Sequence, residues 1–272
     1  MQRRSIAAPK SRRLSKGVCS LVVTYEKKGN IAVFTLNRPE ARNAISHEVS
    51  SELEKHLEEF ESDDDAWVAI LAANGSVFSA GADLKSVSSG KRIETEKGGF
   101  AGLVRYPRTK PLIAAVDGPA LAGGLEIVLA CDLVVASTAA TFGIPEVKRS
   151  LIAGAGGLFR LPASIARNVA MELALTGDPI TAERAFQLGL VNTLCQPGSV
   201  IENATELAGR IVVNAPIAVR ESRKVVLETH GCSDDDGWDI TKEHFRVVLK
   251  TEDFNEGPLA FVEKRDPVWK GR

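Results

Sequence analysis

Apolar residues follow two different spacings along the first two hundred positions, and each spacing predicts one kind of element. Residues 21–25 and 31–36 are rich in β-branched and aromatic side chains and flank a turn-prone Lys-Lys-Gly-Asn, which predicts a hairpin. Residues 45–60 carry an apolar residue every three or four positions, which predicts an amphipathic helix packed on a sheet. Its apolar positions are Ile45, Val49, Leu53, Leu57 and Phe60. Short apolar runs at 68–71, 112–116 and 133–136 have the character of buried strands in α/β proteins.

The pattern changes after Gly198, where helical spacing continues without strand-like alternation. Helices are expected at 200–213, 217–229 and 238–249, with Pro216 suited to a helix start. We therefore predict a basic tail at 1–17, an α/β core at 18–200 and a helical C-terminal region at 201–272. Residues 86–99 are polar, flanked by glycine and without periodicity, and are predicted to form a mobile loop.

Composition narrows the class of protein and its location. The 272 residues are 44% apolar and 25% charged, as in soluble globular proteins. The net charge is −1, yet the first 16 residues hold six basic groups and no acid. This tail is expected to be a disordered extension; an expression remnant, a targeting peptide and a nucleic-acid arm are the alternatives. We expect a cytoplasmic protein, or a mitochondrial matrix protein if the tail is a transit peptide.

Two further patterns bear on membranes, disulfides and metals. The most apolar stretch, residues 111–136, is interrupted by three acids and cannot cross a membrane. The four cysteines lie far apart without a Cys-x-x-Cys pair, which favours a reducing compartment over disulfides or zinc. The four histidines lack metal-ligand spacing, and Phe159 stands where a dinucleotide-binding loop at 154–159 needs its last glycine. Neither a metal nor a nicotinamide cofactor is expected.

Three separate stretches place small residues where a strand gives way to a turn or helix. They are Phe-Ser-Ala-Gly-Ala-Asp-Leu at 78–84, Ala-Gly-Gly-Leu-Glu-Ile at 122–127, and Phe-Gly-Ile-Pro-Glu-Val at 142–147 followed by Gly-Ala-Gly-Gly at 154–157. Glycine and alanine let a ligand approach the backbone, and amides at a helix N-terminus are unpaired within the helix. Such amides can hold a developing oxyanion, although any one of these stretches alone is a weak signal.

Together with Leu-Asn-Arg-Pro at 36–39, Asn-Ala-Ile at 43–45 and the closing segment at 256–264, these stretches resemble the enoyl-CoA hydratase/isomerase family, or crotonase superfamily. The resemblance runs from about residue 20 to the C-terminus and is greatest to enoyl-CoA hydratases. It implies an α/β spiral of ββα units followed by helices used in trimerisation, with trimers often pairing into hexamers. It also implies an acyl-CoA substrate, with coenzyme A as part of that substrate and no separate cofactor.

The same resemblance assigns roles to particular residues. The amides of Ala82 and Gly123 would form an oxyanion hole for the thioester oxygen, where losing one donor costs about 3 kcal/mol. Glu126 would hold and activate water, and Glu146 would exchange the proton at C2. Two carboxyl groups in a poorly solvated pocket push their pKa values upward and apart, which keeps one of them available as an acid.

Coenzyme A contacts are expected next to the first oxyanion residue. Arg42, Asp83, Leu84 and Lys85 are candidates for its adenine, ribose or phosphate groups, beside Ala82 and Gly123 themselves. The resemblance adds Lys264 as a phosphate neighbour contributed by the same or an adjacent subunit. For Asp83 a helix-capping role is the alternative.

Several activities remain open at the level of sequence. Glu126 and Glu146 together favour hydration of a 2,3-enoyl-CoA, as in fatty-acid β-oxidation, or the reverse dehydration, including that of a carnitinyl-type thioester. An isomerase usually needs only one of these acids, so isomerisation is the weaker alternative. RNA binding through the basic tail is an alternative from another class. The tail has no aromatic residue for base stacking and the remaining chain is acidic, so nucleic acid is not an expected partner.

Overall fold

The structure is a computed structural model that describes residues 21–272. The predicted tail at 1–17, with its targeting and nucleic-acid alternatives, lies outside the described residues, as does Cys19. None of the helices in the described part combines the length and the apolar character needed to cross a membrane.

A six-stranded sheet forms the centre of the molecule, in the order β1-β2-β3-β6-β8-β11. Its strands are β1 (Val23–Lys28), β2 (Ile31–Leu36), β3 (Val68–Ala73), β6 (Leu112–Val116), β8 (Leu133–Ser137) and β11 (Thr193–Cys195). Only β1 and β2 are antiparallel, joined by a two-residue turn at Gly29 and Asn30; the other neighbours are parallel. The predicted hairpin and all three predicted buried strands are confirmed.

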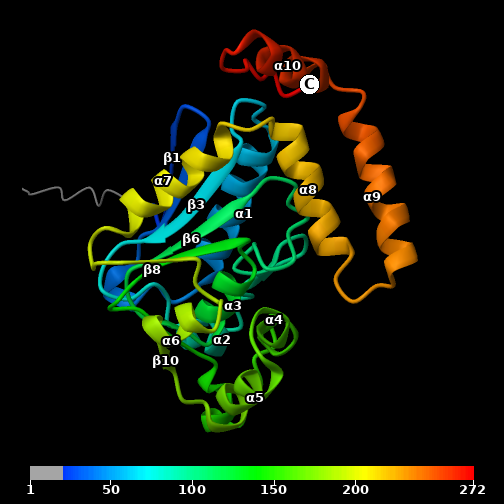
Figure 1. The fold of residues 1–272 in the computed structure, drawn as a ribbon. Coiled ribbons are helices and arrows are strands. Elements are labelled where there is room, and N and C mark those ends of the chain that lie inside the picture. Colours follow the sequence, from blue (N-terminus) through cyan, green and yellow to red (C-terminus); the bar gives the residue numbers. More distant parts are fainter. Residues whose placement is uncertain (1–20) are drawn as a thin grey trace, which may run out of the picture.

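Helices cover both faces of this sheet (Figure 1). On one face lies α1 (His47–Ser62), which buries the apolar positions that its spacing predicted from Val49 to Phe60. On the other lies α7 (Val200–Val212), whose Ala204 and Ala208 pack with Val68, Ile70 and Ala72 of β3. The alternate β3 residues, Ala69 and Leu71, join the core on the α1 side. Both faces of a central parallel strand are therefore buried, as its continuous apolar run predicted.

The sequence predicted that Ile45 is the first apolar residue of α1, and the structure corrects this prediction. Ile45 lies before α1 rather than within it, because Ser46 is extended and its side chain accepts the Val49 amide as a helix cap. Ile45 is nevertheless fully buried and forms a bridge with Ala82. Its apolar character therefore reflects packing against a second segment and not a place on the helix.

Two parallel strands of the large sheet, β6 and β8, each lead into a short strand of a second, smaller sheet. The second sheet consists of β7 (Ala120–Leu121), β9 (Thr141–Gly143) and β10 (Ile180–Thr181) in the order β10-β9-β7. After β7 comes α3 (Gly123–Leu129), and after β9 come the 3₁₀ helix η2 (Pro145–Arg149) and α4 (Gly157–Ser164). These successive units make the spiral of ββα units that the resemblance implied. Other helices in this part are η1 (Pro39–Ala41), α5 (Arg167–Thr176) and α6 (Ala182–Gln187).

Residues 86–99 have more regular structure than predicted. Helix α2 (Leu84–Ser88) runs into this segment, and β4 (Glu94–Thr95) pairs with β5 (Gly99–Phe100) as a small hairpin. Glu54 of α1 anchors the hairpin by accepting hydrogen bonds from the Thr95 hydroxyl and the Gly98 amide. The expectation of an irregular loop was therefore wrong in part, because its anchor lies more than forty residues earlier in the chain. Its mobility stays a prediction.

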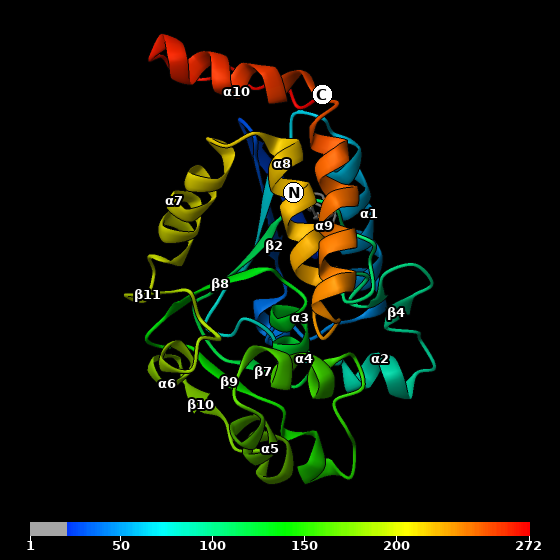
Figure 2. The ribbon, with the colours of Figure 1, turned by 45° about the vertical axis from the view of Figure 1, so that its right-hand side comes forward.

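The C-terminal region is helical, as predicted. Helix α8 (Pro216–Glu228) begins at Pro216, and α9 (Asp234–Val248) begins earlier than expected because Ser233 caps it. A further helix, α10 (Glu252–Glu263), was not predicted from spacing, and it contains Pro258 in its interior. Figures 1 and 2 show α8 and α9 side by side at one flank of the sheet and α10 at one end of the molecule.

Candidate active site

The segment that carries Ala82 is held in place by backbone hydrogen bonds to two other segments. The Ile45 amide donates to the Gly81 carbonyl at 2.8 Å, and the Asp83 amide donates back to Ile45 at 2.9 Å. On the other side, the Leu121 amide donates to the Ser79 carbonyl at 3.0 Å. Residues 79–83 therefore lie between the strand-like segment before α1 and the end of β7, which leads directly into α3.

Gly81 and Gly123 touch where these segments meet. Gly81 has φ +88°, and a Cβ on it would lie 2.9 Å from the Gly123 amide nitrogen. A side chain at Gly123 would in turn meet the ring of Phe100 at 2.5 Å. Glycine is therefore required at both positions, by conformation at the first and by space at both.

The Ala82 and Gly123 amides are unpaired within the described residues, because neither donates a hydrogen bond to a protein acceptor there. Gly123 is the first residue of α3, so its amide has no partner in the helix and lies at the positive end of the helix dipole. The preceding Ala122 has φ +53° and ψ −129°, a costly conformation for a residue with a side chain. The fold thus brings two predicted oxyanion residues together, with both donors available.

Glu126 lies in the first turn of α3, three residues after Gly123, and is only 3% exposed. Its Oε1 accepts the amides of Ala155 at 2.7 Å and Gly157 at 2.9 Å, while Oε2 has no donor among residues 21–272. Burial raises the pKa of this carboxyl, and the two amides and the positive charge of Arg160 offset part of that rise. One oxygen is thus fixed by the protein and the other is left for a ligand.

Glu146 comes from η2, in the following ββα unit, and is partly buried. Its Oε2 is buried without a hydrogen-bond partner in the described part of the chain. Burial raises the pKa of Glu146, and the charge of Glu126 raises it further. The structure therefore brings the two predicted catalytic carboxyl groups within electrostatic reach of each other, and both are shifted toward their protonated forms.

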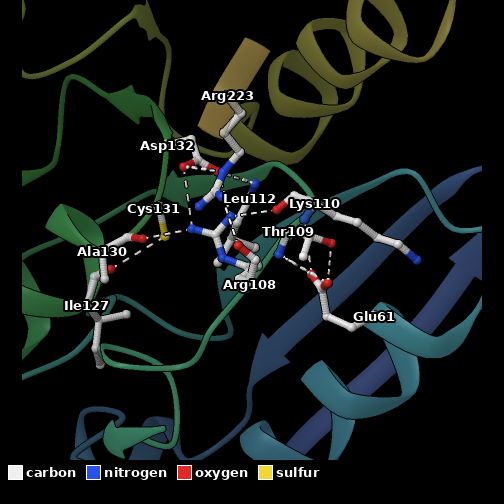
Figure 3. Close-up of polar contacts among 10 residues, drawn as sticks. All are labelled: Glu61, Arg108, Thr109, Lys110, Leu112, Ile127, Ala130, Cys131, Asp132 and Arg223. Atoms are coloured by element: carbon white, nitrogen blue, oxygen red, sulfur yellow. Dashed lines mark hydrogen bonds and ion pairs between the residues drawn. The ribbon is translucent and has the colours of Figure 1, made fainter. Parts of the chain in front are cut away.

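The far end of α3 is tied to the rest of the molecule by an ion-pair network (Figure 3). Arg108 donates to the Ala130 carbonyl at the end of α3 and pairs with Asp132 at 2.5 Å. Arg223 of α8 pairs with the other Asp132 oxygen at 2.9 Å and donates to the Arg108 carbonyl. The helix that carries Gly123 and Glu126 is thereby linked to the C-terminal helices.

Among the predicted coenzyme A contacts, some side chains are exposed and one, Asp83, binds other groups of the protein. Arg42 and Lys85 are exposed, and Leu84 is 71% exposed. Asp83 is engaged: it caps α2 by accepting the Lys85 and Ser86 amides and pairs with Arg38 at 3.1 Å. Its capping alternative is therefore confirmed. Arg42 stays next to the oxyanion segment because its carbonyl accepts the Ala80 amide at 3.1 Å.

Lys264 lies far from the other predicted contacts within one copy of the chain. It ends α10, which Figures 1 and 2 both place at the opposite end of the molecule from α2 and α3. The structure therefore does not bring Lys264 to this site, and a contact from an adjacent subunit stays a prediction.

Three features of the site were not predicted. Arg38 holds Asp83, the amides of Ala155 and Gly157 hold Glu126, and Arg160 contacts the loop that carries those amides. The glycine-rich stretch 154–157 had signalled a close backbone approach, but nothing local indicates that the approaching group is the Glu126 carboxylate. Within residues 21–272, no three His, Cys, Asp or Glu side chains gather in a group that could hold a metal ion.

Comparison with known proteins agrees with this geometry. The family model described as enoyl-CoA hydratase/isomerase matches residues 26–272. A carnitinyl-CoA dehydratase of Escherichia coli K12 is 38% identical over 254 residues, covering 90% of this chain and 97% of that protein. An enoyl-CoA hydratase structure from Mycobacterium tuberculosis H37Rv is 45% identical with a TM-score of 0.90, covering 93% of this chain and all of the other.

A carnitinyl-CoA hydratase structure from Mycobacterium avium is 46% identical with a TM-score of 0.75, and it covers 93% of this chain and 99% of the other. These similarities extend across the sheet, α3 and the C-terminal helices, so they include every segment of the site described above. The chain belongs to the enoyl-CoA hydratase/isomerase family, the crotonase superfamily, and its chemistry is a reaction of an acyl-CoA thioester.

Proposed function

We propose that this chain is an enoyl-CoA hydratase, which reversibly adds water across the 2,3-double bond of an enoyl-CoA thioester. The observation that carries the proposal is the electrostatic pairing of the buried Glu126 with the partly buried Glu146. Glu126 lies on the same helix turn as the unpaired Gly123 amide, which lies beside the segment of Ala82. Hydration requires one proton to be removed from water and another to be delivered to carbon. A pair of carboxyl groups with raised pKa values suits both tasks near neutral pH.

The proposed reaction passes through an enolate. Glu126, with Oε1 fixed by two amides, holds water through Oε2 and takes one of its protons as the hydroxyl adds to C3. Charge moves onto the thioester oxygen, where the Ala82 and Gly123 amides stabilise the enolate more than the ground state; each donor contributes about 3 kcal/mol. Glu146 then gives its proton to C2, and proton exchange between the carboxyl groups or with solvent restores the starting state.

Dehydration of a carnitinyl-type thioester is the second candidate. It is supported by the carnitinyl-CoA dehydratases that are 38% identical over 90% of this chain and by the 46% identical carnitinyl-CoA hydratase structure. The reaction uses the same steps in reverse, with water leaving C3. Isomerisation finds less support, because it needs no second carboxyl group to activate water.

The test follows the loss of enoyl-thioester absorbance with crotonyl-CoA and longer enoyl-CoAs, and, in parallel, water release from carnitinyl-CoA. Glu126→Gln and Glu146→Gln should each lower kcat by about 10²- to 10⁴-fold while crotonyl-CoA still binds. Glu172→Gln, an exposed position on α5, is the matched control and should keep full activity. A double variant that turns over crotonyl-CoA at the wild-type rate would overturn the mechanism.

We also propose that the chain assembles as a trimer or as a pair of trimers. Large apolar side chains are exposed on the C-terminal helices, as expected of a surface that a second copy covers. They include Val226, Trp238, Phe261 and Val262, which are 65% to 85% exposed. Light scattering after size-exclusion chromatography should give three or six times the chain mass, and a monomer would contradict the proposal.

A further inference from the structure

We infer that Arg160 is a positioning residue for Glu126: its guanidinium fixes the loop whose amides hold the Glu126 carboxylate, and its charge favours the ionised form. The inference deepens the proposed function and rests on it. Glu126 can take a proton from water only when its carboxyl group is ionised, so a residue that favours the ionised form matters for hydration. Arg160 itself does not touch the reacting atoms in this scheme.

The contacts of Arg160 cross two segments of the molecule. Arg160 lies on α4, and its Nη2 donates to the Val104 carbonyl at 2.6 Å, 56 residues earlier in the chain. Its Nη1 donates to the Ala155 carbonyl at 3.2 Å, and the guanidinium lies over the Phe159 ring at 5.0 Å. The side chain therefore joins the loop before α4 to the turn that follows β5.

A single residue, Ala155, connects this arginine to the carboxylate. Its carbonyl accepts from Arg160, and its amide donates to Glu126 Oε1 at 2.7 Å. Movement of the guanidinium would therefore release the Ala155 peptide and, with it, one of the two amides that orient Glu126. The Gly157 amide, which donates to the same oxygen at 2.9 Å, belongs to the first turn of the helix that carries Arg160.

The two glycines next to Ala155 leave the space that this arrangement needs. A Cβ on Gly156 would lie 2.2 Å from Arg160 Nη1, and Gly156 has φ +110°. A Cβ on Gly157 would lie 3.1 Å from Glu126 Oε1. The absence of side chains at Gly156 and Gly157 therefore leaves space for the Arg160 guanidinium on one side of this stretch and for the Glu126 carboxylate on the other.

Charge gives Arg160 a second effect on Glu126. Within the described residues no carboxylate lies within ion-pair distance of Arg160, so its half-buried charge acts mainly on its surroundings. The titratable or charged groups around it are Glu126, the buried Cys131 thiol and Arg108; Glu126 also faces Glu146. Burial raises the pKa of Glu126, and among the charged side chains of the described residues Arg160 is the cation that lowers it.

The test compares Arg160→Gln and Arg160→Lys with Arg167→Gln, an exposed control at the start of α5. The pH profile of kcat/KM for crotonyl-CoA should show the low-pH limb of Arg160→Gln moved upward by about one pH unit, since loss of a nearby opposite charge raises a carboxyl pKa. The activity of Arg160→Gln should recover as pH rises through the moved limb, up to the pH at which Glu146 loses the proton that it delivers to C2. Arg160→Lys should shift less because the charge remains, and the control should match wild type. If Arg160→Gln lowers kcat/KM by the same factor at every pH and the low-pH limb does not move, the inference is wrong.

A second readout does not depend on turnover. Carboxyl ¹³C signals of labelled glutamate, with Glu126 assigned from its absence in Glu126→Gln, give the titration of Glu126 directly. We expect a higher midpoint in Arg160→Gln than in wild type. If wild type turns over no enoyl-CoA but this midpoint moves, the proposed function fails and the electrostatic coupling holds. If wild type is active and the midpoint does not move, the inference about Arg160 is wrong.

Discussion

A Cβ on Gly81 would lie 2.9 Å from the amide nitrogen of Gly123, although the two residues are more than forty positions apart. Gly81 precedes Ala82, and Gly123 supplies the second proposed oxyanion donor, so this contact sets the separation between the two donors. Donors of this kind act only when they are fixed at the place where charge develops.

Gly81→Ala should therefore lower kcat/KM strongly, by about 10²-fold or more, because the new methyl group must push α3 away from residue 82. The strain of a side chain at φ +88° adds to the effect. Gly189→Ala is the matched control, since Gly189 has φ +84° but open space around its Cβ position. Gly189→Ala should lower thermal stability without lowering kcat/KM. Steady-state kinetics and thermal unfolding of both variants separate the clash from the strain, and equal kinetic losses would contradict the prediction.

The partly buried carboxyl of Glu146 should make stability depend on pH. Burial raises its pKa above the ordinary value of 4.5, so the folded state holds the proton more tightly than the unfolded state. This contribution is fully present below the unfolded pKa and is lost as pH rises through the folded pKa. Each unit of difference corresponds to about 1.4 kcal/mol.

Glu146→Gln removes this loss, so its Tm relative to wild type should rise between pH 4 and pH 8. Exposed Glu172→Gln provides the comparison and should show a difference that does not change with pH. Calorimetry or fluorescence melting at several pH values measures both. If the Tm difference between Glu146→Gln and wild type is constant or falls as pH rises, the pKa of Glu146 is not raised in the folded state and the prediction is wrong.

Asp132 should be a major contributor to stability. Burial raises its pKa, but the adjacent Arg108 and Arg223 outweigh burial and lower it, so its contribution is present at neutral pH and is lost as pH falls. Asp132→Asn leaves two guanidinium groups without their carboxylate and should cost about 3 kcal/mol in urea unfolding at pH 7. Asp178→Asn breaks the exposed pair with Lys148 and should cost below about 1 kcal/mol. Comparable losses in the two variants would contradict this ranking.

Asp253 should hold the C-terminal residues against α10. The residue is 3% exposed, and its carboxylate accepts the amides of Lys270 at 2.7 Å and Gly271 at 2.9 Å. Asp253→Ala should increase hydrogen exchange in 252–272 without changing exchange in the central sheet, because these amides lose their acceptor. Asp239→Ala, at an exposed position on α9, is the control. Unchanged exchange in 252–272 would show that other contacts suffice.

Local patterns in the sequence were sufficient for most of the fold. The β-branched and aromatic residues at 21–25 and 31–36, with the turn between them, predict a hairpin, and the spacing from Val49 to Phe60 predicts one buried helix face. Those features depend on neighbours two to four residues apart, where backbone preference and amphipathicity act directly. The helices after residue 200 follow the same rule, apart from α10, whose Gly257 and Pro258 obscure the helical pattern.

The positions that matter for chemistry needed the tertiary structure. Sequence placed glutamates and small residues in the right stretches through family resemblance, but it did not determine that Gly81 meets Gly123 or that Glu126 Oε1 accepts the Ala155 and Gly157 amides. It also left Asp83 open between ligand contact and helix cap, and placed Ile45 in a helix. These outcomes depend on segments tens of residues apart meeting at the edge of two sheets. Such contacts depend on how the whole chain packs. The backbone preferences of neighbouring residues do not determine which distant amide donates to a buried carboxylate.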